Sequence, residues 1–236
     1  MKGESKFWRA VVHSHLLQGI AIGVVKLLFR VKIRDYAMFP APGPYIIVSN
    51  HASHYDLLFG LTGFMDIARH QKHPHRLPVP AAWAGALDMR IVGPILRAVP
   101  CVGIERRRGQ EAKRMAAVRE LVRHVKDGRW LIFSAEGKRQ EALGKFEEGP
   151  AFVSLLTGVP VLPVTIRGAH NLYSDMNRIP RLWGRVEVVG HPPIDPKEFQ
   201  SAGGTRDEIL ARMTAAIRER VSAALDYQVA ELPVKK

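Results

Sequence analysis

Short apolar runs alternate with longer mixed runs along most of this chain. The apolar runs predict buried strands, at Tyr45–Ser49, Val79–Ala84, Val99–Ile104, Trp130–Ser134, Val161–Ile166 and Arg185–Val189. The mixed runs predict helices at Asp56–Arg69, Asp88–Ala98, Gln110–Lys126, Glu148–Thr157 and Arg206–Leu225. Gly128 and Gly158 follow two of these helices, where a terminating glycine is expected. The alternation predicts an α/β domain with a mostly parallel central sheet flanked by helices.

The first 39 residues differ from the rest and end at the proline-rich break Pro40–Pro44. We therefore expect an N-terminal helical segment at 1–39 and the α/β domain at 40–236. The stretch Phe7–Phe29 is mostly apolar, and basic residues lie on both sides of it. Charged and polar residues interrupt it, namely Arg9, His13, His15, Gln18 and Lys26. No small-residue cleavage site follows it, so a signal peptide is not expected. A membrane-spanning helix is not expected either, because no run of about 18 uncharged apolar residues exists.

Two interpretations of this segment remain open at this point. It can form one or two amphipathic helices that lie in a membrane interface, with Phe7 and Trp8 among the anchors. It can also form a helix that packs on the protein's own core.

The charge of the chain narrows the classes of partner. The formal net charge is +13, while the 47% hydrophobic and 24% charged residues are ordinary for a folded protein. A surplus of this size points to a polyanion, which could be nucleic acid, anionic lipid or a phosphorylated substrate. The single cysteine, Cys101, excludes an intramolecular disulfide and a CxxC metal site.

The segment 50–56, Asn-His-Ala-Ser-His-Tyr-Asp, directly follows the first predicted strand of the α/β domain. His51 can take a proton from a hydroxyl group near neutral pH, and Asp56 can orient its imidazole. Two alternatives fit the same residues. The segment can simply cap a helix through Asn50 or Ser53. It can also hold a metal through His51, His54 and Asp56, as in a metal-dependent hydrolase.

Two further polar segments follow predicted strands. Residues 102–109 contain Arg106, Arg107 and Arg108, whose planar guanidinium groups suit phosphate or an RNA backbone. Residues 134–139 read Ser-Ala-Glu-Gly-Lys-Arg, where Gly137 allows a tight turn and close approach of a ligand. A solvated charge cluster and a plain polar turn are the simpler interpretations of these segments. In a parallel sheet, however, ligands bind at the carboxyl ends of the strands, where all three segments are expected.

The order of these segments resembles that of the glycerolipid (lysophospholipid) acyltransferase family. The resemblance covers about residues 40–170 and rests on four ordered blocks, NHASHYD, VGIERRR, SAEGKRQ and GVPVLPVTIRG. The family pattern usually has Phe-Pro in place of Ser134-Ala135 and Thr in place of Lys138. The second block leaves open whether Arg106 or Arg108 matches the family's arginine.

The resemblance implies transfer of a fatty acyl group from acyl-CoA or acyl carrier protein to a hydroxyl of a lysophospholipid such as lysophosphatidate. It implies His51 as general base, oriented by Asp56, with the acceptor oxygen as the nucleophile. The acceptor's phosphate is then expected to be bound by Arg106 or Arg108 together with Glu136, Gly137, Lys138 and Arg139. The acyl donor is a co-substrate, and neither a metal nor another cofactor is implied.

With this resemblance, we expect the protein to lie on an anionic membrane surface, as a peripheral protein of the cytoplasmic face, with no nucleic-acid partner. A low aromatic content of 8% also speaks against a nucleic-acid stacking surface. The acceptor can instead be glycerol phosphate, an amino-lipid or another alcohol or amine. A nucleic-acid-binding protein and a metal-dependent hydrolase are the remaining alternatives.

Overall fold

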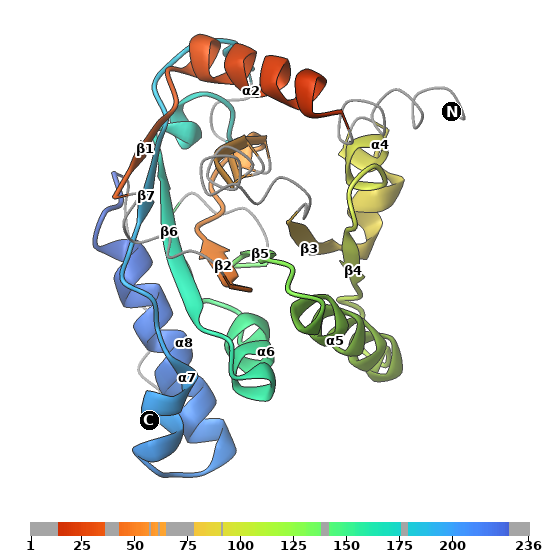
Figure 1. Ribbon diagram of the computed structural model, residues 1–236, viewed down its shortest axis with the longest axis vertical. Helices are drawn as coiled ribbons and strands as arrows, with labels where there is room; N and C mark the ends of the chain where they lie inside the picture. Colours follow the sequence, from red (N-terminus) through yellow and green to blue (C-terminus); the bar gives the residue numbers. More distant parts are fainter. Residues whose placement is uncertain are drawn as a thin grey trace.

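A single seven-stranded sheet forms the centre of the molecule (Figure 1). The computed structural model describes residues 14–35, 43–56, 58–60, 62–64, 78–90, 92–137, 142–175 and 179–226. The strand order is β1-β7-β6-β2-β5-β3-β4, and the pair β6 and β7 is antiparallel while the other neighbours are parallel. The predicted α/β class with a mostly parallel sheet is therefore confirmed.

The strands fall close to the apolar runs of the sequence. Their bounds are β1 Lys32–Arg34, β2 Ile46–Ser49, β3 Val79–Trp83, β4 Val102–Ile104, β5 Leu131–Ser134, β6 Val161–Arg167 and β7 Glu187–Gly190. Strand β4 is shorter than predicted, because Pro100 lies in a turn and has no N–H to donate to a neighbouring strand. Strand β1 was not predicted, since a three-residue edge strand with alternating charges carries no apolar signal.

Helices cover both faces of the sheet. Their bounds are α2 His15–Phe29, α4 Val92–Leu96, α5 Glu111–Lys126, α6 Gly149–Thr157, α7 Pro196–Ser201 and α8 Arg206–Ser222, with 3-10 turns at Ala84–Asp88 and Ala169–Asn171. Asp56, 58–60 and 62–64 are also helical, whereas the predicted remainder of that helix to Arg69 lies outside the described residues. The short helix α7 was not predicted, although Asp195 caps it and Pro196 starts it.

Two apolar clusters separate the two faces of the sheet. On one face, Leu121, Met213 and Ile217 from α5 and α8 pack against strand residues such as Val48 and Phe133. On the other face, Phe29 of α2 and the helical residues Phe59 and Phe64 pack against Ile47 and Val188. The central strand β2 is buried along its whole length, so its carboxyl end is held on both sides.

Helix α2 packs one side on the sheet and leaves the other side apolar and exposed. Ile22 and Phe29 are buried, whereas Leu16, Ile20 and Leu27 face solvent. Of the two interpretations of this segment, packing on the protein's own core therefore holds for the buried side of α2. The predicted amphipathic pattern of residues 1–13 lies outside the described residues, and the boundary at 39/40 stays a prediction, although β1 before it joins the sheet.

Among the described helices, none combines the length and the apolar content that crossing a bilayer requires.

Candidate active site

His51 and Asp56 lie together just beyond the carboxyl end of β2. The Nδ1 atom of His51 is 2.9 Å from Oδ2 of Asp56, and the same oxygen accepts a 2.7 Å hydrogen bond from the backbone N–H of Ser53. The side chain of Asp56 is only 3% exposed, while that of His51 is 21% exposed. The other ring nitrogen of His51, Nε2, bonds to none of the described residues. The carboxylate therefore fixes the ring, and Nε2 remains available to a ligand.

Asn50 holds this turn in place, which the sequence had suggested only as a helix cap. Its side chain accepts a 2.7 Å hydrogen bond from the N–H of Ile166 and donates a 2.9 Å bond to the carbonyl of the same residue. Asn50 is buried, and this pair of hydrogen bonds continues the ladder between β2 and β6 beyond the last pair of strand residues. The chain then turns at His51, so the imidazole lies at the carboxyl end of the central strand β2.

Glu136 ties the His51 turn to the neighbouring strand. It follows β5, and its Oε2 accepts the backbone N–H of His51 at 2.7 Å while Oε1 accepts that of Gly144 at 3.1 Å. Burial raises the pKa of Glu136 to about 7, although both N–H bonds act in the opposite direction. Both carboxylate oxygens thus accept hydrogen bonds from backbone N–H groups. This geometry supports a role for Glu136 in positioning the loop, in place of the expected contact with phosphate.

Gly137 lets a second loop close over the end of β5. Its φ is +66°, and a Cβ atom on it would lie 3.1 Å from Cγ of Glu147. The backbone N–H of Glu147 donates to the carbonyl of Ala135 at 2.8 Å, so segment 144–147 lies against segment 135–137. The left-handed backbone therefore favours glycine at 137, and the side chain of Glu147 would have to shift slightly for any larger residue.

Arg106 is the arginine that faces this region. Its guanidinium carbon lies 5.8 Å from the centre of the Trp83 ring, at the end of β3. Burial lowers the pKa of Arg106, and the negative charge of Glu147 opposes that shift. Arg106 and Arg108 are both exposed, but Arg108 makes no such ring contact with the described residues. Sequence gave no reason to prefer Arg106, because the role of Trp83 depends on pairing of β3 with β4.

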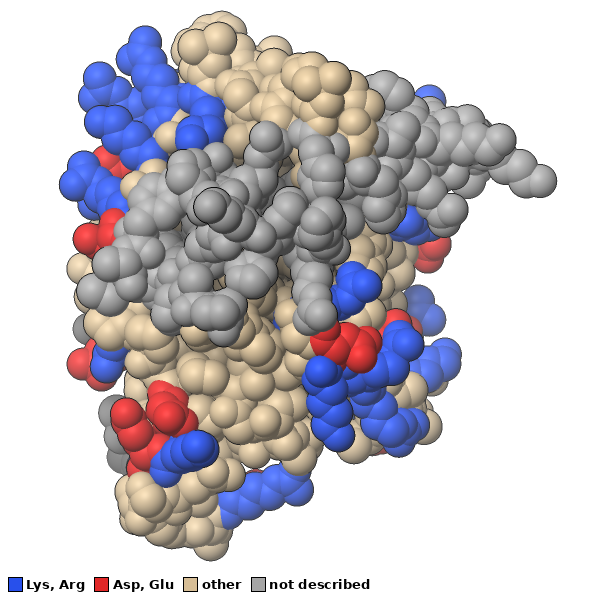
Figure 2. All heavy atoms as spheres, viewed as in Figure 1, with Lys and Arg blue, Asp and Glu red and all other residues tan. Residues whose placement is uncertain are grey.

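Positive charge gathers around the start of α5, as the sequence predicted. Arg106, Arg107 and Arg108 are all exposed. Figure 2 shows Lys and Arg gathered on the side of the molecule where Figure 1 places α5. The predicted site residues Lys138 and Arg139 lie outside the described residues.

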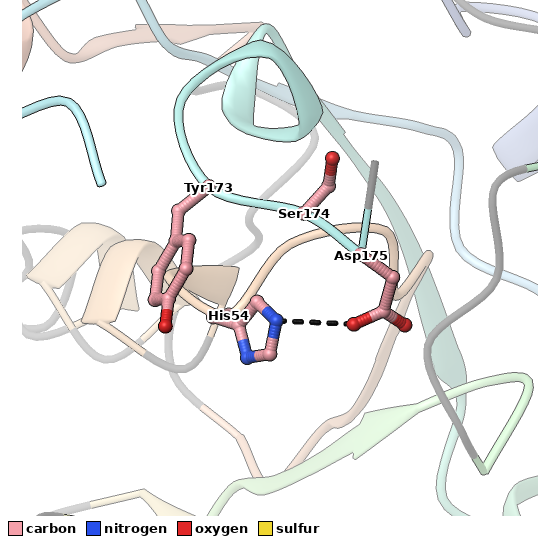
Figure 3. Close-up of a pocket in the computed structure, with 4 residues that line it drawn as sticks. All are labelled: His54, Tyr173, Ser174 and Asp175. Carbon is pink, nitrogen blue, oxygen red and sulfur yellow. Dashed lines mark hydrogen bonds and ion pairs between the residues drawn. The ribbon is translucent and has the colours of Figure 1, made fainter. Parts of the chain in front are cut away.

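His54 contacts Asp175 and Tyr173 and lines a pocket with them. Its Nε2 lies 3.1 Å from Oδ1 of Asp175, and its ring stacks on Tyr173 at 4.2 Å (Figure 3). These residues and Ser174 line a pocket of about 380 Å³. In the part of the chain that the structure describes, no three His, Cys, Asp or Glu side chains cluster as metal ligands. The arrangement of His51, His54 and Asp56 therefore gives the hydrolase alternative no support.

Cys101 is a poor candidate for a nucleophile. Burial raises the pKa of its thiol to about 12, so the reactive thiolate is scarce at neutral pH.

Comparison with known proteins identifies the family. The model of the family described as Acyltransferase matches residues 30–167, which span β1 to β6. The chain belongs to the Acyltransferase family. The match contains His51, Asp56, Arg106 and Glu136, so the predicted resemblance is confirmed at the level of the family.

Several members of this family are similar over most of the chain. The 1-acyl-sn-glycerol-3-phosphate acyltransferase alpha of Mus musculus is 28% identical over 210 residues, which are 85% of this chain and 62% of the mouse protein. The Homo sapiens protein of the same name is 29% identical over 199 residues, 79% of this chain and 62% of its own length. The chain thus spans less than two thirds of these relatives.

The fold is also shared with a solved structure. The 1-acyl-sn-glycerophosphate (LPA) acyltransferase of Thermotoga maritima superposes with a TM-score of 0.62, over 94% of this chain and 87% of that one. Sequence identity is 20%, so this likeness concerns the fold.

Proposed function

We propose that this acyltransferase moves a fatty acyl group from a thioester donor, acyl-CoA or acyl carrier protein, to a hydroxyl of a lysophospholipid such as lysophosphatidate. The observation that carries the proposal is the pair of His51 and Asp56. A carboxylate holds Nδ1 at 2.9 Å, and Nε2 lies at the carboxyl end of a parallel strand. The relatives named above, whose names specify 1-acyl-sn-glycerol-3-phosphate, support the choice of acceptor.

The reaction needs one base and no acyl-enzyme. Nε2 of His51 takes the proton of the acceptor hydroxyl, and the oxygen attacks the thioester carbonyl carbon. The C–S bond then breaks, an ester forms, and the departing sulfur receives the proton from the imidazolium. Asp56 stabilises the imidazolium while it exists, and Glu136 keeps the backbone of His51 in place.

The acceptor's phosphate is proposed to bind near Arg106. Strands β2 and β4 are separated by β5 and β3, so their ends lie roughly 14 Å apart at the usual strand spacing. The long side chain of Arg106 covers part of that distance and already lies over Trp83. A glycerol backbone between His51 and Arg106 fits this separation. Lys138 and Arg139, which follow Gly137 in the sequence, remain proposed phosphate ligands.

We also propose that the enzyme works as a peripheral protein on an anionic membrane surface at its cytoplasmic face. The exposed leucines of α2 support contact with lipid, and the net charge of +13 supports attraction to anionic head groups.

A test of the function is thiol release from acyl-CoA and from acyl carrier protein with a panel of acceptors. The panel contains lysophosphatidate, glycerol phosphate, a lysolipid with an amine head group, and monoacylglycerol without phosphate. Transfer should be fastest with lysophosphatidate and should persist with a metal chelator. Fast transfer to another acceptor with none to lysophosphatidate would refute the acceptor assignment, and activity lost on chelation would restore the hydrolase alternative.

The matched variants are His51→Ala and His54→Ala. Removing a general base typically costs 10²- to 10⁴-fold, so His51→Ala should lower kcat by at least about 10²-fold. His54→Ala should lose far less, because the ring of His54 contacts Asp175 and Tyr173, whereas Asp56 holds the ring of His51, the proposed base. The reverse order of losses would contradict the assignment of His51.

A further inference from the structure

A second exposed apolar segment lies beside α2, although it is distant in sequence. It is the loop Ile179–Arg185, which precedes β7. Trp183 is 72% exposed and Leu182 is 58% exposed. The backbone N–H of Gly184 donates to the carbonyl of Leu28 at 3.2 Å, so the loop adjoins the exposed leucines at the end of α2. Two exposed apolar segments therefore lie next to each other.

The backbone of this loop is held on both sides of the exposed pair. Arg181 donates its N–H to the carbonyl of Leu172 at 3.0 Å, and Val186 donates to that of Phe29 at 3.1 Å. A Cβ atom on Gly184 would lie 2.4 Å from Cδ2 of Leu172, so only glycine allows this approach. Leu182 and Trp183 thus lie on an anchored loop, where most of their surface stays exposed to solvent.

Basic side chains surround this apolar surface. Arg30 and Lys32 follow α2, Arg181 and Arg185 flank the exposed pair, and all four are exposed. The nearby acid Glu187 is balanced by Arg34 at 2.9 Å and Arg167 at 3.5 Å. Figure 2 shows Lys and Arg gathered beside the tan surface of α2, where α2 leads into β1. Tryptophan and leucine within a basic rim is the composition of a surface that binds anionic lipid.

We infer that loop 179–185 is a second membrane contact, which docks on an anionic bilayer together with α2. A helix alone can rotate about its own axis at a bilayer, whereas two contacts fixed to one sheet set the orientation of the whole domain. The loop is joined to the body at Leu172, close to Tyr173 and the His51 turn, so docking through it also fixes the active site relative to the lipid surface. The inference goes beyond the proposed reaction and is tested without substrate.

The first experiment is sedimentation of the full chain with vesicles of phosphatidylcholine and phosphatidylglycerol. The double variant Leu182→Ser, Trp183→Ser should partition into these vesicles at least about tenfold less, since two large apolar side chains no longer reach the acyl chains. Leu156→Ser is the matched control: Leu156 is 54% exposed on α6, far from α2 in Figure 1, and its loss should leave binding unchanged. Equal binding of the double variant and the wild type would overturn the inference.

A second measurement uses a conservative change. In a Trp8→Phe, Trp83→Phe background, only Trp130 and Trp183 remain, and lipids brominated on their acyl chains should quench tryptophan fluorescence. A further Trp183→Phe change should remove most of this quenching, whereas Trp130→Phe should remove little, because Trp130 is half-buried and bonded to Gly43. Quenching that survives Trp183→Phe would overturn the inference. A second result would also overturn it: in ultracentrifugation without vesicles, the wild type forms a dimer and the double variant is a monomer. The apolar surface would then bind a second copy of the chain.

Discussion

Replacement of Asp56 by Asn tests what the carboxylate contributes to the proposed base. Oδ2 of Asp56 accepts two hydrogen bonds, from Nδ1 of His51 at 2.9 Å and from the N–H of Ser53 at 2.7 Å. If the Asn amide nitrogen took that place, it would face the Ser53 N–H, and two donors would meet. The Asn oxygen should therefore occupy the Oδ2 position and keep the proton on Nδ1. The ring then keeps its tautomer and loses only its charged partner.

The size of the loss follows from this geometry. A hydrogen bond to a charged group contributes about 1.5–3 kcal/mol and a neutral one about 0.5–1.5 kcal/mol. The imidazolium that forms during the reaction should thus lose about 1–1.5 kcal/mol, which lowers kcat on the order of tenfold. A wrong tautomer would cost far more, about 10⁴-fold in a catalytic triad.

Stability should change little in this variant. Oδ1 of Asp56 is already buried without a hydrogen-bond partner among the described residues, so an amide nitrogen there replaces one unpaired group by another. Asp56→Ala is the contrasting variant, since it also leaves the Ser53 N–H and Nδ1 unpaired.

The assay is kcat from thiol release at saturating donor and acceptor, with thermal unfolding measured in parallel. Asp56→Asn should retain about a tenth of wild-type kcat, and Asp56→Ala should retain much less. An Asn variant as inactive as Ala, but equally stable as the wild type, would refute the argument that Ser53 fixes the amide.

Two further predictions concern the phosphate site and its support. Arg106→Ala should lower kcat/KM for lysophosphatidate by about 10- to 150-fold, the equivalent of 1.5–3 kcal/mol, and Arg108→Ala should have a much smaller effect; a loss confined to the KM of acyl-CoA would assign Arg106 to the donor. Because burial raises the pKa of Glu136 from 4.5 to about 7, the ionised carboxylate destabilises the folded state. The unfolding free energy of the wild type, relative to Glu136→Gln, should therefore fall by about 3 kcal/mol as the pH rises from 4.5 through 7. Denaturant titrations across that range measure it, and a difference independent of pH would contradict the buried position of this carboxylate.

Much of the fold could be predicted because its signals are local. The central strands are buried on both faces, so each is an uninterrupted apolar run such as Ile46–Ser49. Helix ends were marked by residues with special backbone freedom, such as Gly158 with a φ of +70°. Where the local signal was weak, prediction failed: β1 is a charged edge strand, and its strand character comes only from pairing with β7.

The candidate base could also be predicted, because His51 and Asp56 are close in sequence and the chain needs only one turn to join them. Contacts between distant segments could not. Glu136 is 85 residues from His51, and its use as a backbone tie follows from the pairing of β2 with β5. The preference for Arg106 over Arg108 likewise depends on where Trp83 ends its strand.

The sequence by itself determined the class of fold and the family, and it predicted the pair of His51 and Asp56, since each of these signals lies in a run of neighbouring residues. Tertiary structure decided which polar side chains face the site and which instead form hydrogen bonds with the backbone, as Glu136 does. It also brought loop 179–185 against the end of α2, through a hydrogen bond between Gly184 and Leu28 that spans more than half of the chain. Sequence periodicity reports how one segment divides between core and solvent, but the neighbours of an exposed side chain are set only when the sheet assembles.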